Sequence, residues 1–144
     1  MNHKNRFLLI AGLCSGTAAL LHFGCIVFGG DWYRFFGAGE QMALMAEAGN
    51  VYPTIITSVI VVLLSSWSMY ALSGAGVILR LPLLRTALCA ISAIYILRGI
   101  AFIPLMPLFP SNSNTFWLVS SSICLAFGIV HAVGIKQSWQ YLGA

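Results

Sequence analysis

The chain has 144 residues, of which 60% are hydrophobic and only 7% are charged, and its mean hydropathy is +0.93. Because soluble domains usually carry about 25% charged residues, this composition excludes an ordinary soluble domain. The net charge of +4 is explained by membrane orientation and by attraction to anionic lipid, so it requires no nucleic-acid partner.

Four apolar segments are each long enough to cross a hydrocarbon core of about 30 Å. They cover approximately residues 7–28, 53–79, 84–105 and 115–135. The first follows a basic start, but its apolar run is too long for the core of a signal peptide. Little chain remains for a second domain. We therefore predict an all-α integral membrane protein in which residues 1–144 form one four-transmembrane-helix bundle.

The segment 31–48 separates the first two predicted spans. Its apolar residues recur at helical spacing, Asp31 can cap its start and Gly49 can end it. These features indicate a short amphipathic helix on the outer surface, although Gly37 and Gly39 permit a bend.

Basic residues determine the expected orientation. They precede the first span, flank the second connection as Arg80 and Arg85, and follow the fourth span as Lys136. Under the positive-inside rule, these ends face the cytoplasm. We expect a multi-pass protein of the inner (plasma) membrane with both termini in the cytoplasm and membrane lipid as its immediate partner.

Arg98 is a cation inside the apolar run "AIYILRGIAF". A rise of about 1.5 Å per residue places it about 20 Å from Arg85, in the outer half of the membrane. Polar residues of the other predicted spans lie at a similar depth: His22, Thr57, Ser58 and Ser121. We interpret Arg98 as the centre of an outward-facing polar pocket for an anionic or polar small molecule or lipid.

Further residues complete this hypothesis. Glu40 is expected to pair with Arg98 when the pocket is empty, and Tyr95 is assigned to the pocket although aromatic residues here are also typical of helix packing. The surface segment would act as a lid through Trp32, Tyr33, Arg34 and Phe36. The alternative is structural: Arg98 either snorkels outward or forms an ion pair with Glu40 that stabilises the fold.

The sequence favours no metal and no cofactor. The four cysteines lie singly on different predicted helices without a CxxC pair. His22 and His131 differ in depth by roughly 15 Å, too far to share a haem or a metal ion. Stripes of small residues, including Gly12 and Gly16, are typical of close helix packing in lipid.

Three functions therefore stay open. The first is a binding or accessory protein or a transport subunit, which would need a homodimer or larger membrane complex to enclose a path. The second is an enzyme acting on a lipid or isoprenoid substrate, with His22 or Glu40 as its acid/base group. The third is a structural partner subunit of a larger membrane complex. A solvent-exposed Glu40 would count against the enzyme.

Overall fold

A computed structural model describes residues 4–143, and every regular element in that range is helical. The elements in chain order are α1 (Arg6–Phe28), α2 (Gly30–Phe35), α3 (Glu40–Glu47), α4 (Val51–Gly74), α5 (Leu84–Ile100), α6 (Phe102–Leu105), the 3-10 helix η1 (Met106–Leu108), α7 (Asn114–Gln137) and α8 (Trp139–Gly143).

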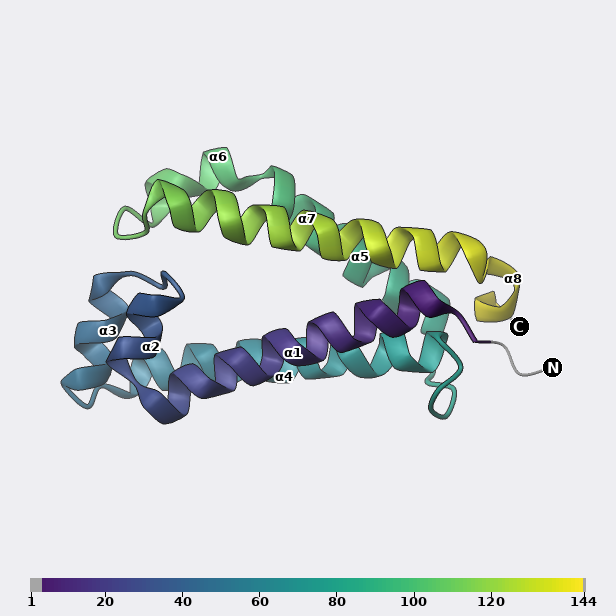
Figure 1. The fold of residues 1–144 in the computed structure, drawn as a ribbon, viewed down its shortest axis with the longest axis horizontal. Coiled ribbons are helices and arrows are strands. Elements are labelled where there is room, and N and C mark those ends of the chain that lie inside the picture. The colour runs from purple at the N-terminus through teal and green to yellow at the C-terminus, as the bar shows by residue number, and fades with distance from the viewer. Residues whose placement is uncertain (1–3, 144) are drawn as a thin grey trace.

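The long helices form two antiparallel pairs, α1 with α4 and α5 with α7 (Figure 1). The pairs lie together where the chain termini meet and separate towards the opposite end, which carries α2, α3 and α6 (Figure 1). We call the end with the termini the basic end, because it holds Lys4, Arg6, Arg80, Arg85 and Lys136. The opposite, far end holds Asp31, Arg34, Glu40 and Glu47.

Small residues bring the helices of each pair close together. Ser68 of α4 donates a hydrogen bond of 2.7 Å to the carbonyl oxygen of Gly12, and a Cβ at Gly16 would lie 3.1 Å from the Ser68 hydroxyl. In the other pair, a Cβ at Gly99 would lie only 2.8 Å from the backbone nitrogen of Leu125. The packing role predicted for Gly12 and Gly16 is therefore confirmed.

The predicted boundaries need correction at two places. The span predicted over 84–105 ends at Ile100, and residues 102–108 bend away from α5 by 70°. Pro104 explains the break, because it has no N–H for the carbonyl of Ile100 and its ring would clash there. The helix predicted to reach residue 79 ends at Gly74, and the Ser73 hydroxyl then donates to the carbonyl oxygen of Leu79 at 2.9 Å.

The surface segment is two short helices rather than one. Between α2 and α3, Gly37 and Gly39 adopt φ values of 72° and 97°, which favour glycine. The bend that these glycines permit is therefore present.

Within residues 4–143, α1, α4 and α7 are each long and apolar enough to cross a membrane. The bent unit of α5 with residues 102–108 would make a fourth span. Large apolar side chains remain exposed along these helices, for example Leu20 at 72% and Val62 at 65%. The fold is thus that of an all-helical protein with three or four candidate membrane-spanning helices, for which a four-helix bundle is a plausible arrangement.

Candidate functional site

Arg98 lies in the last turn of α5, half-buried against α7. Its guanidinium donates hydrogen bonds to the hydroxyls of Ser121 at 3.1 Å and Ser120 at 3.2 Å. Its Cζ atom also lies 4.9 Å from the ring centroid of Trp117, within the range of a cation–π interaction. A cation in the last turn is favoured by the helix dipole, so both helices hold the charge in place.

No carboxylate compensates this charge within the described chain. All three acidic residues of the sequence are bound to Arg34 instead: Glu40 at 2.9 Å, Glu47 at 3.1 Å and Asp31 at 3.5 Å. The short chain between α2 and α3 brings these residues together on the surface. The expected Glu40–Arg98 ion pair is therefore replaced by a Glu40–Arg34 pair.

The Arg34 cluster also sets the protonation of its carboxylates. Hydrogen bonds from the Arg34 guanidinium hold the pKa of Glu40 and that of Glu47 below the ordinary value of 4.5, and they raise the pKa of Arg34. Glu40 is exposed to solvent. A carboxylate with a lowered pKa is a weak proton acceptor, which argues against Glu40 as the base of an enzyme.

Trp117 adds an unsatisfied donor beside Arg98. Its side chain is 3% exposed, and its Nε1 atom has no hydrogen-bond partner among residues 4–143. An unpaired buried donor costs about 1–3 kcal/mol, so such groups usually have a partner when the protein functions. Indole and guanidinium are both pure donors. Their chemistry suits a ligand that offers only acceptors, such as a carboxylate or a phosphate.

The other predicted pocket residues do not all join Arg98. His22 places its Nδ1 atom 2.7 Å from the Ala18 carbonyl oxygen of its own helix. Thr57 is buried and shares a hydrogen bond of 3.0 Å with the Tyr33 hydroxyl. Ser58 is half-buried on α4. Ser121 is thus the predicted hydroxyl that the structure places against the arginine.

Tyr95 lies in the core between the helices. It is 4% exposed, and its hydroxyl shares a hydrogen bond of 2.9 Å with Ser15 of α1. Its ring centroid lies 4.9 Å from that of Trp67, 5.6 Å from that of Phe127 and 5.4 Å from that of His131. These contacts connect all four long helices. They favour a packing role for Tyr95 over a place in the pocket beside Arg98.

The predicted lid residues cover the far end of the α1–α4 pair. The ring of Trp32 stacks on that of Phe28, with centroids 4.5 Å apart, and packs over Gly24. The ring centroid of Phe36 lies 5.5 Å from that of Trp32. Tyr33 fastens α2 to α4 through its bond to Thr57. The segment is therefore anchored on one helix pair.

The same segment also reaches the other helix pair. A Cβ at Gly37 would lie 2.8 Å from the Phe116 ring, and one at Gly39 would meet Ser111 and Asn112 at the same distance. Phe116 in turn packs edge-to-face on Trp117, with centroids 5.7 Å apart. A continuous series of contacts therefore runs from the α2–α3 connection to the tryptophan under Arg98.

Sequence reasoning placed Ser121 in the candidate set but left out Trp117 and Ser120. The run of three serines at 120–122 was the available signal, because three successive residues span about 200° around a helix, so most registers of α7 turn one of them towards α5. Among residues 4–143, no group of three or more His, Cys, Asp or Glu side chains could hold a metal ion.

Comparison of the chain with protein-family models, curated proteins and solved structures finds no match. The fold therefore defines the class: a helical protein with three or four apolar helices, compatible with a membrane protein. Its candidate site is Arg98, which forms hydrogen bonds to serines but has no carboxylate partner among residues 4–143.

Proposed function

We propose that this protein is a multi-pass protein of the inner membrane that binds an anionic small molecule or lipid head group at Arg98. The basic end would face the cytoplasm, in accord with the positive-inside rule. Arg98 would then lie in the outer half of the membrane. The protein would serve as a binding or accessory protein, or as a transport subunit.

One observation carries this proposal: Arg98 has no carboxylate partner among residues 4–143 and lies over the ring of Trp117, whose indole N–H has no hydrogen-bond partner among the same residues. An arginine in an apolar region costs about 2.5–3.5 kcal/mol near a helix centre on insertion scales. Two serine hydroxyls lower that cost without neutralising the charge. An anion would neutralise it and accept the remaining hydrogen bonds.

The surface segment would act as a lid over this site. Because Tyr33 and Trp32 anchor it on α1 and α4, movement would be taken up at Gly37 and Gly39. The contact of Gly37 with Phe116 would transmit that movement to Trp117. Ligand entry at Arg98 would thus be linked to the position of the α2–α3 connection.

The two other functions have less support. The exposed Glu40, paired with Arg34, offers little to an enzyme that needs a carboxyl group of raised pKa. A structural partner would need open faces of small residues, but Gly12 and Gly16 already pack on Ser68 within the chain.

Native mass spectrometry of protein extracted gently from its own membrane tests the proposal. The wild type should carry a bound small molecule or lipid, and Arg98→Gln should lose it while keeping the same helix content and oligomeric state. The matched control is Arg6→Gln, which removes an exposed arginine at the basic end.

Loss of the bound mass from both variants would show only a general dependence on charge. Wild-type protein that carries no ligand and an Arg98→Gln variant that is merely less stable would refute the proposal, since Arg98 would then be structural.

A further inference from the structure

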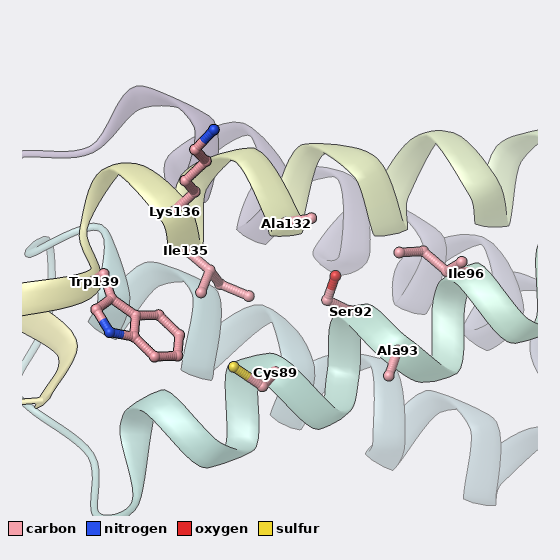
Figure 2. Close-up of a pocket in the computed structure, with 8 residues that line it drawn as sticks. All are labelled: Cys89, Ser92, Ala93, Ile96, Ala132, Ile135, Lys136 and Trp139. Carbon is pink, nitrogen blue, oxygen red and sulfur yellow. The ribbon is translucent and has the colours of Figure 1, made fainter.

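A shallow groove of about 410 Å³ lies between α5 and α7 on the side of the bundle. Figure 2 shows that α5 contributes one wall, α7 the opposite wall and Trp139 of α8 the end next to Cys89, while Lys136 extends away from α5. The lining is almost wholly apolar, and the one hydroxyl, that of Ser92, is used by the carbonyl oxygen of Gly128 at 2.9 Å. The groove therefore suits a hydrocarbon chain.

A second hollow, of about 510 Å³, lies at the basic end. It is lined by Arg80, Arg85 and Thr86, together with residues of the connection before α5 and the end of α8. Arg80 donates hydrogen bonds of 2.8 Å to the carbonyl oxygens of Tyr141 and Leu142. Arg85 forms no ion pair with any carboxylate of residues 4–143. This hollow is cationic and suits a phosphate.

The two hollows adjoin each other. The guanidinium of Arg85, which lines the cationic hollow, lies 4.8 Å from the ring centroid of Trp139, which ends the apolar groove. On α5 the lining positions continue from Arg85 through Cys89 and Ala93 to Ile96, at steps of three and four residues that follow one helix face. This stripe spans about 16 Å, which matches one leaflet of a hydrocarbon core of about 30 Å.

We infer that this composite surface binds one anionic phospholipid of the cytoplasmic leaflet, with its phosphate at Arg85 and one acyl chain along the α5–α7 groove. The cationic hollow lies at the basic end, where the phosphate of a lipid in the cytoplasmic leaflet would lie. The apolar groove extends from it along α5 and α7, where an acyl chain would lie. Trp139 covers the junction, where aromatic residues commonly meet the membrane interface. The inference rests on the membrane placement proposed above, but it does not involve the Arg98 site.

The test is native mass spectrometry of detergent-purified protein incubated with dioleoylphosphatidylglycerol or with dioleoylphosphatidylcholine. Wild type should retain phosphatidylglycerol in preference to phosphatidylcholine. Arg85→Gln should weaken this retention about fivefold, the effect of one cation at an anionic membrane surface, and Arg85→Lys should restore it. Ala93→Trp should block the groove and reduce retention of phosphatidylglycerol without altering the charge.

A control variant separates this site from other cations. Arg6→Gln, at the basic end but outside both hollows, should retain phosphatidylglycerol as the wild type does. Thermal unfolding followed by circular dichroism verifies that every variant is folded.

Equal retention of the two lipids by the wild type, or equal losses in Arg85→Gln and Arg6→Gln, would overturn the inference. A dimer that Ala93→Trp dissociates would overturn it as well, because the groove would then hold a second copy. Recovery of the protein in the soluble fraction without detergent would instead refute the membrane placement itself.

Discussion

Arg98→Gln distinguishes a binding arginine from a structural one. Glutamine removes the positive charge but keeps an amide that can donate to a serine hydroxyl. In the structure Arg98 makes hydrogen bonds to Ser120 and Ser121 and lies over Trp117. Loss of these contacts should destabilise the empty protein, whereas removal of a charge from an apolar region should stabilise it.

The magnitudes nearly offset. A hydrogen bond from a charged group contributes about 1.5–3 kcal/mol and a cation–π contact about 0.5–2 kcal/mol, with lower values at a half-exposed site. Removing an arginine from an apolar region recovers up to about 2.5–3.5 kcal/mol, and less near a helix end. We expect the free energy of unfolding of the empty variant to lie within about 1 kcal/mol of the wild-type value.

The response to an anion should differ much more. A ligand present at a hundred times its dissociation constant stabilises a protein by about 2.7 kcal/mol. Thermal unfolding of detergent-purified protein, followed by circular dichroism, would be compared with and without sodium phosphate and sodium acetate at constant ionic strength. Stabilisation by either anion should appear in the wild type and be absent from Arg98→Gln.

If the empty variant loses more than about 3 kcal/mol, which is the cost typical of breaking a buried charged contact, and neither anion stabilises the wild type, Arg98 is a structural residue.

Three further predictions concern the fold. Gly99→Ala should destabilise the protein by about 1–3 kcal/mol in thermal unfolding, because the new Cβ would lie 2.8 Å from the backbone nitrogen of Leu125. Tyr33→Phe should cost about 0.5–1.5 kcal/mol and increase proteolysis of the α2–α3 segment, since Thr57 loses its partner. The carboxylates bound to Arg34 have lowered pKa values, so their contribution is complete above pH 4.5 and is lost as pH falls below it. This loss should appear in the wild type as an acid transition in tryptophan fluorescence, and Arg34→Gln should abolish it. An unchanged acid transition in the variant would contradict the assignment.

In the Arg34 cluster at the far end, some features follow from the local sequence and others from the tertiary structure. The composition of segment 31–48 indicated an amphipathic surface element, and its glycines marked the place of a bend. The partner of Glu40 could not be read from it. Arg34 and Arg98 were both available cations, and the turn at Gly37 and Gly39 brings α3 back onto α2, which makes Arg34 the nearer one.

By itself, the sequence determined the helical class, the approximate positions of the long apolar helices and the grouping of basic residues, because hydropathy and charge act locally along the chain. The tertiary structure decided which polar groups meet. Depth along each helix predicted that Arg98, His22 and Thr57 share a level, but the rotation of each helix about its axis comes from packing at small residues such as Gly12 and Gly99. That rotation turns Arg98 of α5 towards Ser121 of α7 and leaves His22 and Thr57 with partners of their own.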